Sequence, residues 1–256
     1  MTSNLSSISW GIVGGMGPLA SAEFVRTIYE AAVAVQRGAE QSAPRLLLLS
    51  DPSFPDRTSA LASGEEVELV ARLGAAVSLL AEQGAEAVVV CCVTIHSVLD
   101  QLPAELRALV VPLTDIILRA AVEGEGRHLL LCTKGCRVAR LFEQHPLWPA
   151  ARARVVLPSE EDQEAVHELI YAVKRNCWDA LEAARLVGAL LEKYEAARAI
   201  AGCTELHLVS KRFAECGVRL PLFDPLSVLA GRIAAGRFLN AEEGLTECAE
   251  SLAFSN

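Results

Sequence analysis

The sequence has few aromatic residues and a shortage of positive charge. Aromatic side chains account for 5% of the 256 residues, and methionine occurs twice. There are 23 lysines and arginines against 32 aspartates and glutamates, which gives a formal net charge of −9. The chain is therefore acidic, and it also has no cluster of basic residues. We expect it to bind neither the phosphate backbone of nucleic acids nor an anionic membrane surface.

Long hydrophobic runs are also missing. The longest, at 87–93 and 129–133, have the length of a strand, far below the roughly 20 residues that a membrane-spanning helix needs. Residues 1–9 are polar and lack the basic and hydrophobic regions of a signal peptide. We therefore predict no membrane-spanning segment and a cytoplasmic location.

Cysteine, in contrast, is well represented in the sequence. Eight cysteines would suggest a disulfide framework in a small secreted protein. This chain is instead long and 52% hydrophobic, enough for a substantial core. We therefore expect reduced thiols, some of them reactive.

Short hydrophobic runs alternate with longer amphipathic segments, which predicts an α/β fold with mainly parallel sheets covered on both faces. Strands are predicted at 8–13, 45–49, 87–91, 127–131, 153–157 and 197–201, and helices at 18–35, 65–82, 160–174, 178–194 and 225–237. Ser63 with Glu66 is expected to form a capping box, and Asp224 is expected to cap the helix that begins at Pro225.

Two pentapeptides share a pattern. Residues 92–96 read Cys-Val-Thr-Ile-His and residues 203–207 read Cys-Thr-Glu-Leu-His. Each follows a predicted strand and opens a helical segment. Internal duplication and chance both explain this similarity. If two related halves face each other, the two cysteines lie across one cleft at the carboxyl ends of strands, where open α/β sheets bind ligands.

A cysteine between a strand and a helix lies near unpaired N–H groups and the positive end of the helix dipole. This setting is expected to lower the pKa of the thiol, and the same N–H groups can hold a carboxylate. Because side chains alternate along a strand, only one of Cys91 and Cys92 can enter the cleft, and the similarity to Cys203 selects Cys92. The other cysteines predicted to be small core residues are Cys177, Cys216 and Cys248.

Zinc binding is an alternative role for a set of two cysteines and two histidines, Cys92, His96, Cys203 and His207. Two Cys-x₃-His pairs about a hundred residues apart do not have the spacing of a compact structural zinc site. Each histidine then either orients its neighbouring thiol or packs in the core. We predict no metal site.

Two loops have the composition of a carboxylate site. The turn Gly14-Gly15-Met16-Gly17-Pro18 follows a predicted strand but fits neither dinucleotide-binding nor Walker patterns. A small carboxylate fits such a turn better than a nucleotide does. In the second loop, Arg57 can form a bidentate pair with a carboxylate or pair with Asp56 at the surface.

Several motifs, taken in order, resemble those of the cofactor-independent aspartate/glutamate racemases, in particular the aspartate racemase branch. The matching segments are Gly-Gly-Met-Gly-Pro-Leu-Ala at 14–20, Pro-Asp-Arg-Thr at 55–58, Cys-Val-Thr-Ile-His at 92–96, Thr-Lys-Gly-Cys at 133–136, the helix segment at 170–174 and Gly-Cys-Thr-Glu-Leu at 202–206. The resemblance runs from residue 11 to about residue 208.

This resemblance implies an amino-acid racemase that acts on aspartate or a related acidic amino acid without pyridoxal phosphate, flavin or metal, and that forms a homodimer. One cysteine thiolate would remove the α-proton while the other thiol protonates the opposite face, which assigns Cys92 and Cys203 as the catalytic pair. Arg57 and Lys174 would bind the distal carboxylate. The remaining substrate-binding positions are Met16, Val93, Thr94, Thr133, Thr204 and Glu205.

The resemblance also implies two pseudo-symmetric three-layer α/β domains with an interdomain active-site cleft. We place the first domain at 1–112 plus 224–256, on the Cys92 side, and the second at 113–223, on the Cys203 side. The chain is expected to cross between them near 110–114 and 220–224.

Two positions depart from the family pattern. Val93 stands where the family usually has Asn, and Cys136 where it usually has Thr. Both changes make the cleft more apolar, which leaves a modified substrate specificity open. Two further alternatives are an isomerase or decarboxylase of dicarboxylates, which needs one cysteine, and a binding protein without turnover.

Overall fold

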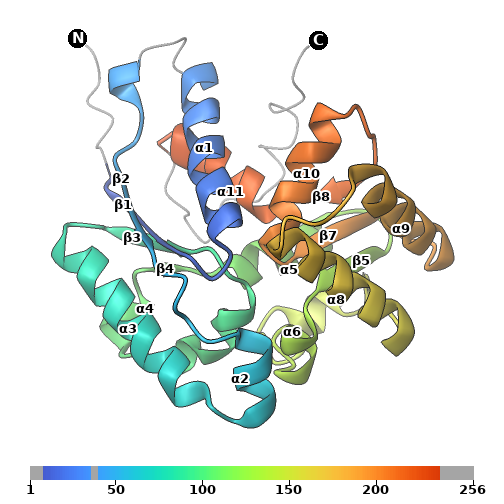
Figure 1. Ribbon diagram of the computed structural model, residues 1–256, viewed down its shortest axis with the longest axis horizontal. Coiled ribbons are helices and arrows are strands. Elements are labelled where there is room, and N and C mark those ends of the chain that lie inside the picture. The colour runs from blue at the N-terminus through green and yellow to red at the C-terminus, as the bar shows by residue number, and fades with distance from the viewer. Residues whose placement is uncertain (1–7, 36–39, 237–256) are drawn as a thin grey trace.

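The computed structural model describes residues 8–35 and 40–236. These residues form two lobes, each built on a four-stranded parallel sheet with helices on its faces (Figure 1). The first sheet has the strand order β2-β1-β3-β4 and the second has the order β6-β5-β7-β8. The predicted α/β class with parallel sheets is therefore confirmed.

The strands are short and carry mostly hydrophobic side chains, as expected for parallel sheets buried on both faces. The first sheet contains β1 (Trp10–Gly14), β2 (Leu46–Ser50), β3 (Ala87–Val90) and β4 (Val110–Val111); the second contains β5 (His128–Cys132), β6 (Val155–Val156), β7 (Arg198–Gly202) and β8 (Leu222–Phe223). Every strand pair is parallel.

Helices connect the strands and cover both sheets. They are α1 (Pro18–Val35), α2 (Arg57–Ser63), α3 (Glu66–Glu82), α4 (Ala104–Arg107), α5 (Leu113–Glu123), α6 (Lys134–Val138), α7 (Trp148–Ala151), α8 (Glu160–Lys174), α9 (Ala180–Lys193), α10 (Glu205–Glu215) and α11 (Pro225–Ala234), with 3₁₀ helices η1 (Glu40–Ser42) and η2 (Thr94–Gln101). None of the described helices combines the length and the hydrophobicity that crossing a bilayer requires.

The two predicted helix caps have different outcomes. Asp224 caps α11 as predicted and accepts a hydrogen bond from the Leu226 N–H (3.0 Å). The predicted capping box is wrong: Ser63 belongs to the end of α2, where its hydroxyl donates to the Ala60 carbonyl and to Glu65. The predicted crossing segments at 110–114 and 220–224 contain β4 and β8, which are too short to show a strand pattern.

The two lobes repeat one topology. Strand order is the same in both sheets, and the two Cys-to-His pentapeptides follow equivalent strands, β3 and β7. The register agrees as well. Val90 of β3 pairs with β1, and Ala201 of β7 pairs in the same way with β5. Cys92 and Cys203 each lie two residues after these positions. This equivalence favours duplication over chance as the origin of the similarity.

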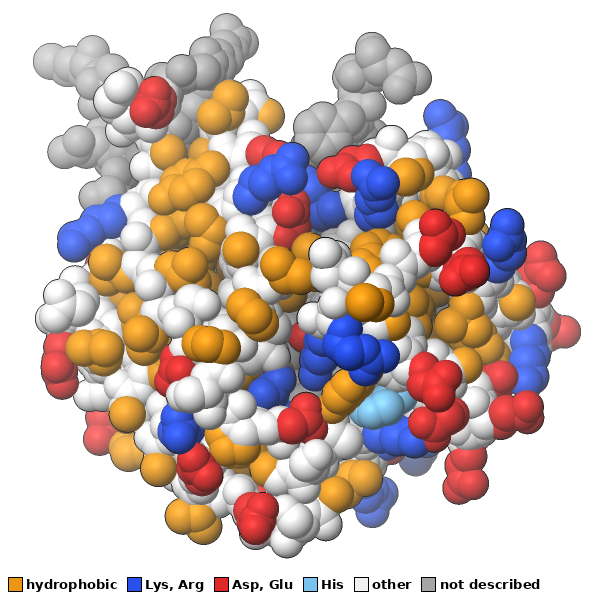
Figure 2. Space-filling view, viewed as in Figure 1, with side chains coloured by type: hydrophobic (Ala, Val, Ile, Leu, Met, Phe, Trp, Pro, Cys, Tyr) orange, Lys and Arg blue, Asp and Glu red, His pale blue; other side chains and the backbone are white. Residues whose placement is uncertain are grey.

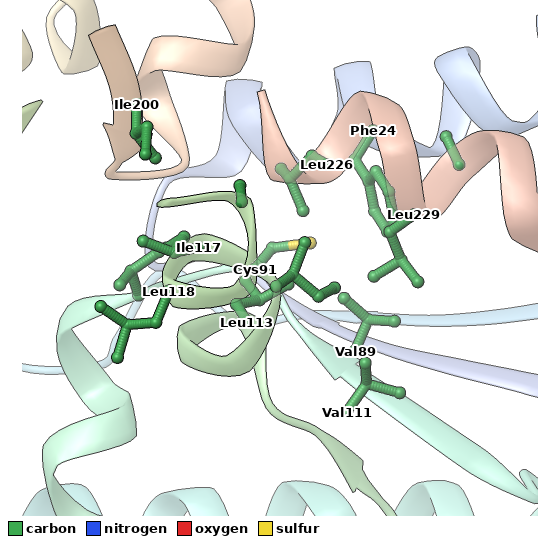
Figure 3. Packing of buried hydrophobic residues seen from close by; sticks show 14 of the residues in the cluster. Phe24, Val89, Cys91, Val111, Leu113, Ile117, Leu118, Ile200, Leu226 and Leu229 are labelled. Atoms are coloured by element: carbon green, nitrogen blue, oxygen red, sulfur yellow. The ribbon is translucent and has the colours of Figure 1, made fainter. Parts of the chain in front are cut away.

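A continuous hydrophobic core joins the two lobes. Helix α11 follows the second sheet in sequence but packs against α1 of the first, where Leu226 and Leu229 meet Phe24 (Figure 3). The same buried cluster contains Val89 of the first sheet and Ile200 of the second. The division at 112 and 223 stays a prediction, and its residues 1–7 and 237–256 lie outside the described part, as does the end of the predicted last helix at 237.

We predict that Gly15→Ala destabilises the protein by about 3 kcal/mol or more. Gly15 has a φ of 91°, and a Cβ there would collide with the backbone of Asp51. Gly64→Ala is the matched control, because Gly64 has a φ of 76° but no atom within 4 Å of its added Cβ. We expect the control to cost only the left-handed strain, about 1 kcal/mol. Urea unfolding measures both, and equal losses would contradict the steric argument.

Candidate active site

Cys92 and Cys203 lie at the carboxyl ends of β3 and β7, one in each lobe. Both are buried, with 7% and 4% of their surface exposed. Cys91 packs into the core cluster of Figure 3, whereas Cys92 packs on the other face with Met16. The two side chains therefore lie on opposite faces of the sheet, as the alternation predicts, and the entry of Cys92 into a cleft stays a prediction.

The pKa values of the two thiols show that they share charged neighbours. Burial raises the pKa of Cys92, with Glu205 adding to the rise and Arg57 and Lys174 opposing it. Burial and Glu205 raise the pKa of Cys203 well above its usual value, and Lys174 again opposes. The prediction that the strand-to-helix setting lowers these pKa values is wrong, because desolvation of the thiolate outweighs the local dipoles.

Glu205 is the nearest polar partner of Cys203. The Cys203 Sγ–H donates to Glu205 Oε2 (2.9 Å), and the carboxylate is almost completely buried. A Cβ at Gly17 would collide with Glu205 Oε1. The glycine turn after β1 therefore lies directly against the second cysteine motif, and a side chain at position 17 would have to displace the Glu205 carboxylate. The resemblance placed Glu205 among the substrate-binding positions but gave no role to its carboxylate.

Arg57 begins α2 and is buried. Its Nη1 donates to the Pro55 carbonyl (2.8 Å) and its Nη2 to the Met16 carbonyl. Burial acts to lower its pKa, but Cys92 and Asp56 raise it by more. Nε is buried and has no hydrogen-bond partner among the described residues. Backbone carbonyls thus hold the guanidinium, and its burial rules out a surface role for Arg57.

Lys174 reaches the site from the last turn of α8. Burial acts to lower its pKa, but Glu205 and Cys203 raise it by more. Its Nζ lies 4.3 Å from the centre of the Tyr171 ring and 4.0 Å from Asp56 Oδ2. The Tyr171 hydroxyl donates to the same Asp56 oxygen (2.8 Å). Asp56, which caps α2, therefore ties the helix of Arg57 to the helix of Lys174.

Threonine hydroxyls form polar contacts between the two lobes, close in sequence to Cys92 and Cys203. Thr94 Oγ1 and Thr133 Oγ1 are 3.0 Å apart, and Cys136 Sγ lies 3.4 Å from each. Hydrogen bonds from Cys132, Thr133 and Thr94 lower the pKa of Cys136. Thr204 Oγ1 donates to the Cys91 carbonyl (3.2 Å). These contacts fix the ends of β3, β5 and β7 relative to one another.

The two histidines of the pentapeptides are fully engaged elsewhere. The Leu113 N–H donates to His96 Nε2 (3.2 Å), so His96 Nδ1 carries the proton and donates to the Cys92 carbonyl (2.9 Å). Burial lowers the pKa of His96 to about 4. His207 Nδ1 lies 2.6 Å from Asp224 Oδ2, and its Nε2 lies 3.0 Å from Thr27 Oγ1. Neither ring is available as a zinc ligand.

The described ranges also contain no other group of side chains arranged as a metal site. No group of three or more His, Cys, Asp or Glu side chains in 8–35 and 40–236 has an arrangement that could hold a metal ion. Cys177 and Cys216 are exposed, so their predicted core role is wrong. They lie just after the ends of α8 and α10. Cys248 lies outside the described residues.

The site thus combines side chains of both lobes. Cys92, Arg57, Met16 and Thr94 come from the first, and Cys203, Lys174, Thr133, Thr204 and Glu205 from the second. Figure 2 shows basic side chains near the middle of this face, in the region where the lobes of Figure 1 meet. The side chain of Val93 instead packs in the core, which leaves only its backbone for a ligand.

Sequence reasoning misses three polar contributors. Asp56 and Tyr171 lie within the matching motifs but receive no role from them. Gln163 of α8 donates from Nε2 to the Cys132 carbonyl (2.8 Å), and its buried Oε1 has no partner among the described residues. Adjacency to Arg57 and Lys174 is the available signal for the first two. Nothing in the sequence points to Gln163.

The structure thus has two parallel α/β lobes with a buried cysteine, Cys92 or Cys203, at equivalent strand ends, which is the arrangement expected of a two-domain racemase-type fold. A family model described as Asp/Glu/Hydantoin racemase matches residues 13–233, and the chain belongs to this family.

Solved structures agree with this assignment. An aspartate racemase from Picrophilus torridus has a TM-score of 0.72 at 24% identity, covering 91% of this chain and 96% of that one. An aspartate racemase homologue from Pyrococcus horikoshii OT3 has a TM-score of 0.63 at 23% identity (89% and 98%). A glutamate racemase from Francisella tularensis has a TM-score of 0.58 at 13% identity (90% and 79%). These likenesses establish the fold, and the family supports a racemase.

We predict that the buried His207–Asp224 pair makes stability depend on pH. Burial acts to lower the pKa of His207, but Asp224 raises it above the unfolded value of 6.5. The stabilisation is therefore complete below pH 6.5 and is lost as the pH rises through the folded pKa. Asp224→Asn should reduce the free energy of unfolding by about 3 kcal/mol at pH 6 and by less at pH 9, as measured by urea unfolding.

Asp115→Asn provides the control for this pair. Asp115 Oδ1 lies 2.9 Å from His145 Nε2, but its carboxylate is 36% exposed. Exposed pairs contribute about 1 kcal/mol or less, so this variant should show a small loss at both pH values. A loss in Asp224→Asn that stays constant or grows toward pH 9 would refute the pairing argument.

Proposed function

We propose that the protein racemises aspartate or a related acidic amino acid by a two-cysteine mechanism, without pyridoxal phosphate. The observation that carries this proposal is the placement of Cys92 and Cys203, one per lobe, within electrostatic range of the same Lys174 and Glu205. A reducing cytoplasmic setting is part of the proposal, because both thiols must stay reduced.

Inversion at the α-carbon needs a base on one face and an acid on the other. One of the two sulfurs takes the α-proton as thiolate while the opposite thiol gives its proton to the planar carbanion. In the reverse direction the roles exchange. Because burial disfavours the thiolate at both positions, the α-ammonium of the substrate and the two cations of the site would supply the compensating positive charge.

Arg57 and Lys174 support an acidic substrate. Each is a buried or largely buried cation, and each lies near thiols and the Glu205 carboxylate. The unpartnered Arg57 Nε and the Lys174 ammonium are donors for the distal carboxylate. Charge that spreads onto the α-carboxylate in the carbanion needs donors that are already in place, and the amides that follow Cys92 and Cys203 have the right position in the chain.

The Glu205 carboxylate can accept the proton of the Cys203 thiol and return it. The Cys203 Sγ–H points at Glu205 Oε2, so this thiol is held protonated and aligned. At the equivalent position of the first lobe stands Thr94, whose hydroxyl is 3.0 Å from Thr133. In our proposal Cys203 therefore starts as the acid and Cys92, beside Arg57, starts as the base.

The alternative functions require fewer of these groups. A dicarboxylate isomerase or decarboxylase would use a single cysteine, whereas both are buried here against shared charges. A binding protein without turnover is compatible with Val93 in the core and with Cys136 in the threonine cluster. Each alternative predicts a result that differs from that of a two-cysteine racemase when exchange and inversion are measured in the cysteine variants.

We predict that the protein exchanges the α-hydrogen of an acidic amino acid with solvent deuterium and inverts it. Cys92→Ser and Cys203→Ser should each lower kcat for inversion by about 10³-fold, since each removes one of two required acid–base groups. Chiral chromatography and NMR in D₂O, without added cofactor, measure inversion and exchange in a screen of L- and D-amino acids.

Cys177→Ser is the control for thiol substitution, because Cys177 is exposed, and it should keep full activity. Activity retained in either Cys92→Ser or Cys203→Ser would favour the one-cysteine alternative. Thermal stabilisation by an acidic amino acid without exchange or inversion would favour a binding protein.

We predict that Lys174→Met lowers the ratio of kcat/KM for aspartate to that for asparagine by about 100-fold. Aspartate loses a buried charge partner worth about 2–5 kcal/mol, whereas asparagine carries no distal charge to lose. Lys193→Met is the control, since Lys193 lies on α9 and pairs with Asp162 at the surface. An unchanged ratio in Lys174→Met would exclude Lys174 from distal recognition.

A further inference from the structure

His207 is a buried histidine to which the proposed mechanism gives no role. It lies in the first turn of α10, two residues after Glu205, and is 0% exposed. Its Nδ1 lies 2.6 Å from Asp224 Oδ2, and its Nε2 lies 3.0 Å from Thr27 Oγ1. The Phe24 ring meets it edge to face, with 6.3 Å between the ring centres. Because both ring nitrogens have partners, the orientation of the ring is fixed.

The partners of His207 come from both lobes. Thr27 and Phe24 lie on α1 of the first lobe, whereas His207 lies on α10 of the second. Asp224 caps α11, the helix that follows the second sheet and packs against α1 (Figure 1). A single imidazole ring therefore links α1, α10 and the start of α11.

The equivalent histidine of the first pentapeptide makes a related link. His96 accepts a hydrogen bond from the N–H of Leu113, the first residue of α5, and donates to the Cys92 carbonyl. Helix α5 follows the last strand of the first sheet in sequence, as α11 follows the last strand of the second. Each histidine thus connects its cysteine motif to the start of the helix after its own sheet. His207 does so through side chains, which substitutions can remove.

The position of α10 relative to α1 matters because α10 begins with Glu205. A Cβ at Gly17, just before α1, would collide with Glu205 Oε1, so the start of α1 is in contact with this carboxylate. Glu205 Oε2 in turn accepts the hydrogen bond of the Cys203 thiol (2.9 Å). The contact at Gly17 is steric and has no preferred direction. The hydrogen bonds of His207 are directional, and the Thr27 bond joins the same two helices.

Charged groups around His207 favour the protonated ring. Burial and Lys211 act to lower the pKa of His207, but Asp224 and Glu23 raise it by more. Glu23 lies on α1, Lys211 lies on α10 and Asp224 precedes α11, so the three helices around the ring each contribute a charge. A protonated imidazole donates from both nitrogens, to Asp224 and to Thr27 at the same time.

We propose that His207 is a positioning residue for Cys203, which fixes α10 against α1 and thereby keeps the Glu205 carboxylate aligned on the Cys203 thiol. The catalytic consequence rests on the two-cysteine function proposed above, in which Cys203 starts as the acid. Loss of the Thr27 bond lets α10 shift and loosens the hydrogen bond between Cys203 and Glu205. Since Glu205 raises the pKa of Cys203, that pKa should then fall.

Thiol labelling tests this alignment without any need for racemase activity. Thr27→Val removes the bond between the lobes but keeps the size of the side chain and the His207–Asp224 pair. Iodoacetamide at pH 8, with peptide mass spectrometry, gives the labelling rate of each cysteine. The rate of Cys203 relative to Cys92 should rise about tenfold, because a pKa lower by one unit gives about ten times more thiolate. The ratio corrects for a general loosening of the fold, which would expose both thiols.

Two variants serve as controls for the labelling ratio. Thr27→Ser keeps the hydroxyl and should restore the wild-type ratio. Lys211→Met removes another contact between α1 and α10, the ion pair of Lys211 with Glu30 (2.7 Å), and should leave the ratio within about twofold of wild type because exposed pairs contribute little. An unchanged ratio in Thr27→Val, or an equal rise in Lys211→Met, would overturn the proposal.

Circular dichroism checks that Thr27→Val is folded. If it is not, Asp224→Asn takes its place, since asparagine still caps a helix but no longer holds the charged ring. The same rise in the ratio is expected, and an unchanged ratio in this variant would overturn the proposal.

Kinetics supply a second readout once inversion by the wild type is established. Thr27→Val should lower kcat by about tenfold and change KM by less than about twofold, because the Thr27 bond aligns the acid and touches no substrate group. A raised KM with unchanged kcat would assign Thr27 to substrate binding and contradict the positioning role. Absence of inversion in the wild type would refute the proposed function, and the labelling ratio would still decide the role of His207.

Discussion

Desolvation of the two thiols is the constraint on which the site depends. Cys92 and Cys203 are buried at strand ends, where the thiolate form is unfavourable. Lys174 opposes this effect at both thiols and Arg57 opposes it at Cys92, whereas the Glu205 carboxylate reinforces it at both. Lys174 and Glu205 therefore act on the protonation of both thiols. A substrate that brings its own positive and negative groups would change that balance at both sulfurs at once.

Pseudo-symmetry provides the frame, and unequal side chains make the two halves different. The cysteines occupy equivalent positions after β3 and β7, but the residue two positions later is Thr94 in one lobe and Glu205 in the other. The histidines two residues beyond these differ in the same way. His96 is neutral between two backbone groups, whereas His207 pairs with a carboxylate. The two halves thus have matched backbones, and their unequal side chains make them chemically different.

The lobes are held together both in the core and at the site. Helix α11 returns from the second sheet to pack on α1, which makes one hydrophobic cluster of both halves. At the site, Asp56 of the first lobe accepts a hydrogen bond from Tyr171 of the second, and Thr94 lies against Thr133. Because the cations and thiols come from both lobes, these contacts set the distances on which any chemistry between them depends.

Much of the fold follows from local pattern. The bounds of α1 and α8 agree with the periodicity of the sequence, and alternation along β3 separates Cys91 from Cys92. The two-residue strands β4 and β8 escape prediction, because two residues carry no period. Ser63 misleads because a serine followed by a glutamate looks the same at the end of one helix as at the start of the next.

The sequence by itself determined the α/β class, the matched cysteine motifs and the candidate cations, because these follow from periodicity and from short motifs. Only the tertiary structure decided how those groups affect each other. It raised the thiol pKa values through burial, turned the Glu205 carboxylate toward Cys203, and brought Asp56 to Tyr171 across 115 residues of chain. Such effects depend on solvent exclusion and on distances between remote segments, which no local pattern encodes.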